Sequence, residues 1–203
     1  MPRSSNPPPA FNRAALHLTT VDPGTRLGRI FLDRYADPLG FGKTPSRFSD
    51  PSRRNASHRF GVLYLGETLK VCFLEAILRD SRNGLVGDYP LDERELRVRR
   101  YAAIDVVAPL SLVDLRGDGA ILMGVPSDVA GASPQGLARA WSQAFHRHPS
   151  APDGIAYPSR LNGQTNLAIY DRAVPKLRVI AESALIAATG LATVLDELRV
   201  AIA

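Results

Sequence analysis

Apolar positions along the chain predict many short strands and few long helices. Runs of alternating or continuous apolar residues, bounded by Gly, Pro, Asn and Asp, are typical of strands. The expected strands cover residues 27–32, 61–65, 153–158, 166–170 and 177–184. Residues 101–115 hold two further apolar stretches split at Ala108–Pro109, which predicts strands at a sheet edge or a bend.

Apolar residues spaced three and four apart predict helices in three places. The first covers residues 70–79, with Thr68 as its N-cap. The second begins at Ser133–Pro134, because serine at the N-cap and proline at the first position are start signals, and the third covers residues 191–202. Because strands and helices do not alternate regularly, we expect an α+β fold: a single compact domain with a mixed or antiparallel β core flanked by helices.

Polar segments suggest how the chain is organised. Residues 1–20 begin rich in Pro, Ser and Asn and are expected to form a partly flexible N-terminal arm, leaving residues 21–203 as the folded domain. Residues 33–59 read as a long polar loop, and long loops in compact domains tend to be functional. Residues 81–100 are charged and are also expected to be loop-like.

Composition points to a soluble protein of the cytoplasm. No stretch approaches the ~20 apolar residues that cross a bilayer, and the N-terminus has no apolar region typical of a secretory signal. One cysteine, Cys72, excludes an internal disulfide and suits a reducing compartment. We therefore expect a cytoplasmic location and no membrane contact.

The positive charge of the chain comes almost entirely from arginine. The net charge is +5, and the lysines are Lys43, Lys70 and Lys176. Arginine binds phosphate and carboxylate in a bidentate way, which favours an anionic ligand such as a nucleotide or nucleic acid. A GC-rich genome that prefers arginine codons explains the same bias, so individual arginines must be judged by position.

Glu75 is the most informative residue. It is the only acid between Val71 and Leu78 in an apolar run, and it shares a helical face with Val71, Leu74 and Leu78. Burying a charge costs several kcal/mol, roughly, so we expect either a partner or a function for this carboxylate. The structural alternative is a side chain that reaches solvent or pairs within its helix.

Five short segments resemble the RES domain family, which is named for an arginine, a glutamate and a serine. The resemblance covers roughly residues 25–172, and the arginine loop departs from the family pattern because it lacks two glycines and has Phe48 and Ser49 in place of Trp and Asn. The matching segments are Gly28-Arg29-Ile30-Phe31, Ser46-Arg47-Phe48-Ser49, Val62-Leu63-Tyr64-Leu65, Phe73-Leu74-Glu75-Ala76 and Asp153-Gly154-Ile155-Ala156-Tyr157-Pro158-Ser159-Arg160.

The resemblance implies a function. Members of the family are typically toxins of bacterial toxin–antitoxin pairs, resemble ADP-ribosyltransferases in fold and consume NAD+. It therefore implies a type II toxin that cleaves the nicotinamide–ribose bond, with NAD+ as substrate and no permanently bound cofactor. It also implies an antitoxin protein that covers the active site. Contact with nucleic acid is expected only indirectly, through that antitoxin. The acceptor stays open: water, phosphate or a protein, the last making it a mono-ADP-ribosyltransferase.

The same resemblance assigns roles to five residues. Glu75 would stabilise the oxocarbenium-like centre, and Arg29 and Arg47 would take part in catalysis and bind the pyrophosphate. Tyr64 would stack on a ring of NAD+, and Ser159 would hydrogen-bond the substrate rather than act as a nucleophile. Each has a structural alternative: an edge charge for Arg29, a solvated loop residue for Arg47, core packing for Tyr64 and a turn residue for Ser159.

Two other classes of function are weighed against this one. The four histidines do not fall at ligand spacing with Cys or one another, so no metal site is expected. A basic nucleic-acid-binding module remains an alternative, although the sequence shows no helix-turn-helix with a basic recognition helix and no RNA-binding aromatic signature.

Overall fold

Residues 5–52 and 55–203 are described by the structure, a computed structural model. Within these ranges eight strands form one sheet in the order β1-β6-β7-β8-β3-β2-β5-β9, and β4 and β10 pair separately. The strands are β1 (Leu18–Val21), β2 (Arg26–Leu32), β3 (Val62–Gly66), β4 (Tyr89–Leu91), β5 (Arg99–Val106), β6 (Leu110–Asp114), β7 (Gly154–Pro158), β8 (Thr165–Tyr170), β9 (Leu177–Ala184) and β10 (Val200–Ile202). The helices are α1 (Leu69–Phe73), α2 (Glu93–Arg97), α3 (Gly119–Leu122), α4 (Asp128–Gly131), α5 (Gly136–His146) and α6 (Leu191–Glu197).

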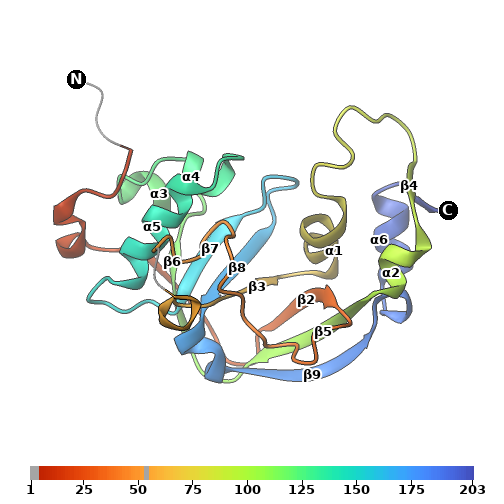
Figure 1. Cartoon of the computed structure of the whole chain (residues 1–203), viewed down its shortest axis with the longest axis horizontal. Coiled ribbons are helices and arrows are strands. Elements are labelled where there is room, and N and C mark those ends of the chain that lie inside the picture. The colour runs from red at the N-terminus through yellow and green to blue at the C-terminus, as the bar shows by residue number, and fades with distance from the viewer. Residues whose placement is uncertain (1–4, 53–54) are drawn as a thin grey trace.

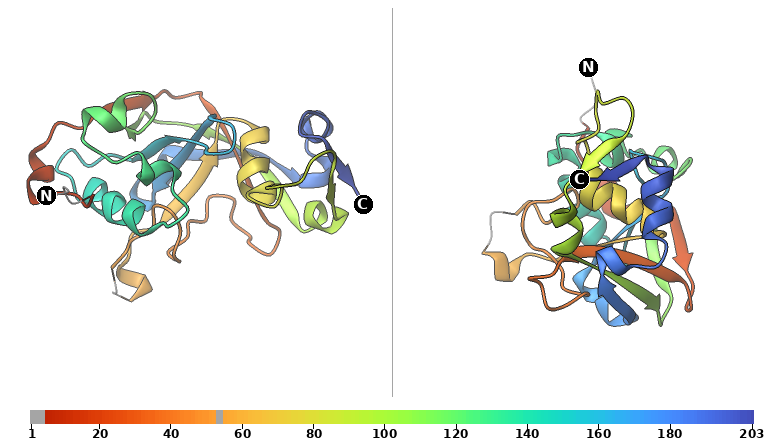
Figure 2. Two further views of the ribbon diagram at one scale, coloured as in Figure 1. Left: turned by 90° about the horizontal axis from the view of Figure 1, so that it is seen from above. Right: turned by 90° about the vertical axis from the view of Figure 1, so that its right-hand side faces the viewer.

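The large sheet is mixed and strongly bent, with helices gathered at its two ends (Figure 1). Strands β6 and β7 run parallel, whereas the other neighbouring strands of this sheet run antiparallel. Helices α3, α4 and α5 lie at one end, and α1, α2 and α6 lie toward the other (Figures 1 and 2). The expected α+β fold with a mixed β core flanked by helices is confirmed.

Strand β8 shows why the central strands read as continuous apolar runs. All six of its residues are buried, because both of its faces are covered. Ala168 and Tyr170 pack into the cluster that includes Trp141 of α5, while Leu167 and Ile169 pack into a second cluster, which other strands of the large sheet share. Asn166 shares the face of Ala168, since side chains alternate along a strand.

Helix α1 begins as the sequence predicts and then widens. Thr68 is its N-cap and accepts a hydrogen bond from the amide of Val71 at 3.1 Å. From Leu74 to Leu78 the chain forms a π-helical turn, η3, a feature often found at functional sites. Leu74 and Leu78 are buried, and Glu75 is half-buried.

Two glycines allow α1 to lie close to the sheet. Gly28 of β2 and Gly66 of β3 are register partners. A Cβ added to Gly66 would lie 2.5 Å from Cγ1 of Val71 and 2.8 Å from Sγ of Cys72, and one added to Gly28 would lie 2.7 Å from the Tyr101 hydroxyl. The absence of side chains at this pair therefore sets how near α1 and η3 come to β3.

The described part of the N-terminal arm contacts the body of the protein. The 3-10 turn η1 (Pro9–Arg13) carries Phe11, which is buried and packs edge-to-face on Trp141 at 4.9 Å. The indole of Trp141 also donates to the carbonyl of Ser5 at 2.8 Å. Further along, β1 is a strand of the large sheet. The boundary proposed at residue 20 stays a prediction, and residues 1–4 lie outside the described part of the chain.

Two element predictions were wrong in part. Residues 81–100 are not all loop, since they contain β4 and α2, and the terminal helix ends at Glu197 rather than continuing to residue 202. Residues 200–202 instead form β10, which pairs with β4, a contact between segments far apart in sequence.

Helix α5 starts later than predicted. The short helices α3 and α4 were not predicted from the sequence. Helix α5 begins at Gly136, with Gln135 at the N-cap position. Ala132 is held extended, and its carbonyl accepts a hydrogen bond from Arg47, so the helix starts beyond Pro134.

Strands β5 and β6 lie inside the sheet order rather than at its edge, and Pro109 lies in the connection between them.

The helices of the described residues are all too short or too polar to span a bilayer.

Candidate functional site

A cavity of about 580 Å³ brings most of the predicted site residues together. It lies over β2 and β3, between α1 with η3 on one side and the loop around Arg47 on the other. Arg29, Arg47, Tyr64 and Glu75 all line it. Its volume is within the range of small-molecule sites, about 300–1,000 Å³.

Glu75 is fixed by two neutral donors. Its Oε1 accepts a hydrogen bond from Ser159 Oγ at 2.8 Å and another from Asn166 Nδ2 at 3.0 Å. Both bonds fall on the same oxygen, which leaves Oε2 outside this clamp. The carboxylate is therefore held in one orientation while it lines the cavity.

Among the described residues, neutral groups rather than a cationic side chain hold the Glu75 carboxylate. Arg29 and Arg47 do not fill the role of a cationic partner, because both guanidinium groups hydrogen-bond to backbone carbonyls. Pairing within the helix is also not what occurs: Lys70 pairs with Glu197 at 2.9 Å, and Arg79 donates to the backbone carbonyl of Glu75 at 2.8 Å. The partners of the carboxylate are a hydroxyl and an amide.

Ser159 is not among the residues that line the cavity, and it is connected to the cavity by its hydrogen bond to Glu75. Its side chain is buried, with the residue 3% exposed. The hydroxyl donates to Glu75 and accepts a hydrogen bond from the amide of Leu161 at 3.2 Å. A serine has one O–H donor, so in this arrangement the serine orients the carboxylate, whereas we predicted a contact with substrate.

Arg29 lies on β2 at the floor of the cavity. Its guanidinium donates to the carbonyl of Pro38 and lies 5.6 Å from the ring centre of Phe31. Burial lowers the pKa of Arg29, and the nearby Asp37 works in the opposite direction. An arginine stays protonated in proteins, so a half-buried positive charge borders the site.

Arg47 belongs to the loop that closes the other side of the cavity. Its Nη1 donates to the carbonyl of Ala132 at 2.8 Å, just after α4. One bond of this kind leaves further donors of the five-donor guanidinium group. Phe48, the next residue, is fully buried and packs on Tyr157 at 4.9 Å, which anchors the loop in the core.

Tyr64 joins β3 to that loop. Its hydroxyl accepts a hydrogen bond from the amide of Phe48 at 2.9 Å and bonds with Ser46 Oγ at 3.0 Å. Burial raises the pKa of Tyr64, so the hydroxyl stays protonated. Tyr64 lines the cavity, and its hydroxyl is engaged by the protein rather than left for a ligand.

Sequence reasoning missed four residues that line the cavity. Asn166 and Tyr157 are register partners on β8 and β7. Burial raises the pKa of Tyr157 well above its ordinary value, which keeps a protonated phenol there. Arg79 and Arg160 add positive charge, and Arg160 pairs with Asp80 at the rim. The visible signals were the polar Asn166 at the start of an apolar strand and the matching segment that contains Tyr157 and Arg160.

No metal cluster is found within the described ranges: no three His, Cys, Asp or Glu side chains gather there as ligands. The buried thiol of Cys72 also lines the cavity, and burial raises its pKa to about 12, so it is an unreactive thiol at neutral pH. The polar side chains that line the cavity include a carboxylate, phenols, amides and guanidinium groups.

Comparisons with known proteins agree with the resemblance seen in the sequence. Residues 26–190 match the RES domain family. A relative from Sinorhizobium fredii (strain NBRC 101917 / NGR234), named "Probable toxin y4kH", is 43% identical over 102 residues, which make up 50% of this chain and 80% of that protein.

A solved structure shares the fold. A chain of the M. tuberculosis MbcT-MbcA toxin-antitoxin complex superposes with a TM-score of 0.62, covering 89% of this chain and 91% of that chain at 19% identity. At that identity the likeness concerns the fold. Because the family match spans residues 26–190 of 203, this protein belongs to the RES domain family.

Proposed function

We propose that this protein is the toxin of a toxin–antitoxin pair and that it cleaves the nicotinamide–ribose bond of NAD+. The observation that carries the proposal is the arrangement of Glu75: a carboxylate held by two neutral donors at one oxygen, in a cavity bordered by arginines. The name of the S. fredii relative and the toxin–antitoxin complex that shares the fold support the same function.

The proposed reaction needs few chemical groups. As the bond between the ribose carbon and the pyridinium nitrogen breaks, its electron pair goes to nicotinamide and positive charge grows on the sugar. The Glu75 carboxylate stabilises that charge without having to reorient, because Ser159 and Asn166 already hold it. The acceptor then forms a bond to the sugar carbon and releases its proton to solvent.

The cationic side chains suit the rest of the substrate. Arg29 and Arg47 line the cavity on different elements and keep donors available for the pyrophosphate. The ring of Tyr64 offers a flat apolar surface for a base or for nicotinamide. NAD+ enters this scheme as a substrate, and the proposed place of action is the cytoplasm.

An antitoxin that covers this cavity is part of the proposal. In the complex that shares the fold, the toxin is bound to an antitoxin. A partner that closes the cavity would keep NAD+ from the arginines and from Glu75, so growth would stop only when the partner is lost.

Surface charge argues against the nucleic-acid-binding alternative. The arginines from the end of α2 into β5 are neutralised by acids: Arg97 pairs with Glu93, Arg99 with Glu95 and Arg100 with Glu182. A phosphate backbone is bound by unneutralised Lys and Arg side chains. This part of the surface therefore lacks the charge that such a module requires.

The first experiment incubates purified protein with NAD+, with and without phosphate, and identifies the products by mass. Free ADP-ribose or its phosphate ester is expected together with nicotinamide; a protein that carries ADP-ribose instead would make the chain a mono-ADP-ribosyltransferase. NAD+ that stays intact under both conditions, and in expressing cells, would refute the proposal.

Glu75→Gln and Arg47→Ala are expected to keep the fold and to lower NAD+ turnover about 100-fold or more, the usual effect of removing a preorganised electrostatic group. Expression of either variant should no longer arrest growth or deplete intracellular NAD+. Glu93→Gln, which changes a half-exposed surface acid (41%), is the matched control and should keep turnover. Normal turnover in both site variants would refute the assignment.

A further inference from the structure

The two donors that hold Glu75 belong to one β-hairpin. Ser159 follows β7 and Asn166 is the second residue of β8, and the segment between them is closed by a hydrogen bond from the Ser159 amide to the Gln164 carbonyl at 2.7 Å. Because side chains alternate along β8, Thr165 points to the face of the sheet opposite Asn166. A residue that holds Thr165 therefore acts on this hairpin from the face of the sheet opposite Asn166.

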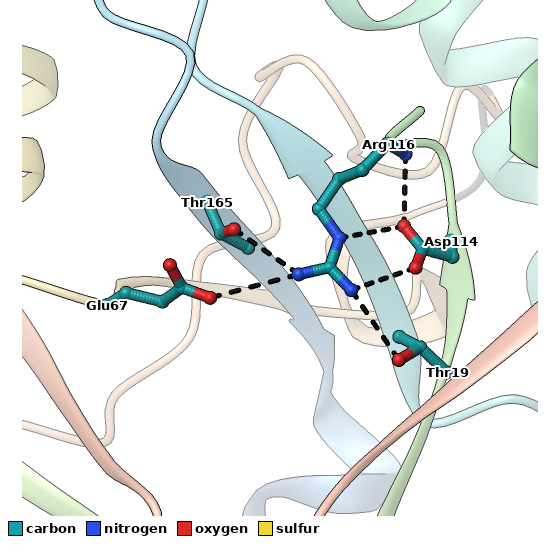
Figure 3. Close-up of polar contacts among 5 residues, drawn as sticks. All are labelled: Thr19, Glu67, Asp114, Arg116 and Thr165. Carbon is teal, nitrogen blue, oxygen red and sulfur yellow. Dashed lines mark hydrogen bonds and ion pairs between the residues drawn. The ribbon is translucent and has the colours of Figure 1, made fainter. Parts of the chain in front are cut away.

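Arg116 is the residue that holds it (Figure 3). Its Nε and Nη2 donate to the two carboxylate oxygens of Asp114, each at 2.8 Å. Its Nη1 donates to Thr165 Oγ1 at 3.3 Å and lies 3.8 Å from a Glu67 oxygen, and Nη2 reaches Thr19 Oγ1 at 3.5 Å. One guanidinium group thus bridges β1, β6, β8 and the end of β3.

The network cross-links strands β6 and β8. Asp114 lies on β6 and Thr165 on β8, the strands on either side of β7, so the guanidinium crosses β7. Burial alone would raise the pKa of Asp114, but hydrogen bonds and charge from Arg116 outweigh it and lower the pKa. The bidentate fork also fixes the direction of the guanidinium.

The backbone continues the connection toward the site. The amide of Glu67 donates to the carbonyl of Thr165 at 3.3 Å, so Arg116 touches both residues at the open end of the β3–β8 ladder. Arg116 does not itself line the cavity. Its effect on the site must pass through the hairpin.

We propose that Arg116 is a positioning residue for Glu75: by pinning Thr165 and Glu67 to β6, it fixes the strand end from which Asn166 donates to the carboxylate. The role of Glu75 in this inference rests on the proposed NAD+ cleavage. Hairpin order itself does not, and it is measured separately.

Arg116→Met removes the guanidinium and keeps an unbranched apolar stem. In that variant we expect kcat for NAD+ cleavage to fall about 10-fold, since small misplacement of a catalytic group is costly, while KM stays within about twofold. Arg26→Met is the control: it removes an arginine that pairs with Asp105 at 3.3 Å on the same sheet and should leave kcat unchanged. Equal loss in both variants would overturn the inference.

A double-mutant cycle tests the route through Asn166. Asn166→Ala should lower kcat, and adding Arg116→Met to it should cause little further loss, because the donor that Arg116 positions is already gone. Two independent, multiplying losses would overturn the proposed route. If Arg116→Met does not fold, Thr165→Val deletes a single hydroxyl and should give the same pattern with a smaller effect.

Amide hydrogen exchange supplies a readout that does not depend on activity. Arg116→Met should speed exchange at residues 159–166 relative to the wild type, and Arg26→Met should not. If the wild-type protein fails to cleave NAD+, the proposed function falls, yet this measurement still decides whether Arg116 orders the hairpin. Unchanged exchange across residues 159–166 would overturn the inference.

Discussion

At the scale of single residues, Tyr64 shows how one side chain serves both core and site. Tyr64 lines the cavity from β3. Its hydroxyl accepts a hydrogen bond from the amide of Phe48, one residue beyond Arg47. A buried backbone N–H without an acceptor costs free energy. The tyrosine hydroxyl therefore holds the arginine loop in place beside the cavity.

Tyr64→Phe tests this connection. We expect the free energy of unfolding to fall by about 1–3 kcal/mol, because the amide of Phe48 loses its acceptor, and KM for NAD+ to rise because Arg47 is less well fixed. Thermal unfolding and steady-state kinetics measure the two effects. Tyr35→Phe, at a residue 53% exposed, is the control, and equal stability of both variants would contradict the argument.

At the scale of elements, the site depends on how closely α1 and η3 approach the sheet. Glu75 reaches Ser159 and Asn166, which are 84 and 91 residues away in sequence, because Gly66 offers no side chain under Val71 and Cys72. The π-helical turn then sets the direction of Glu75 relative to the buried Leu74 and Leu78.

Gly66→Ala is expected to disturb this fit. The new methyl group would lie 2.5 Å from Val71 and 2.8 Å from Cys72, and such overpacking typically costs about 1–3 kcal/mol. Chemical denaturation should show this loss, and turnover should fall as α1 and Glu75 move outward. Gly131→Ala, where a Cβ meets nothing within 4 Å, is the control and should be neutral or stabilising. A fully stable, fully active Gly66→Ala protein would refute the packing argument.

At the scale of the whole molecule, partly buried titratable groups couple stability to pH. His146 ends α5 and stacks on Phe60 at 4.1 Å, with Tyr170 edge-on at 4.9 Å. Burial is the main cause that lowers its pKa to about 4, and Arg172 adds to the effect. In the folded protein this histidine is therefore neutral at pH values where an ordinary histidine, with a pKa near 6.5, gains a proton.

The sign of the pH effect follows from proton binding. Between about pH 6.5 and pH 4, the unfolded chain binds a proton at His146 that the folded chain does not, so the free energy of unfolding decreases as pH falls through this window. Below it, Asp50 and Asp114, whose pKa values are lowered in the fold, remove further stability.

Urea unfolding at several pH values measures this dependence. His146→Phe should flatten the decline between pH 6.5 and pH 4, whereas His58→Gln, at an exposed histidine, should not. A slope unchanged by His146→Phe would exclude His146 as its source.

The sequence by itself determined the local elements and the residue types of the site. Apolar runs located β2, β3, β7, β8 and β9, and Thr68 marked the start of α1, because these signals act over a few residues. The family motifs brought Arg29, Arg47, Tyr64, Glu75 and Ser159 into view.

Only the tertiary structure decided which of these residues meet and what else joins them. The partners of Glu75, the use of the Tyr64 hydroxyl and the Arg116 cross-link all depend on strand order and register, which bring together segments tens of residues apart. The same holds for β4 and β10, each too short to be recognised alone. Local sequence carries no record of such contacts, since the free energy of packing and pairing arises between elements rather than within them.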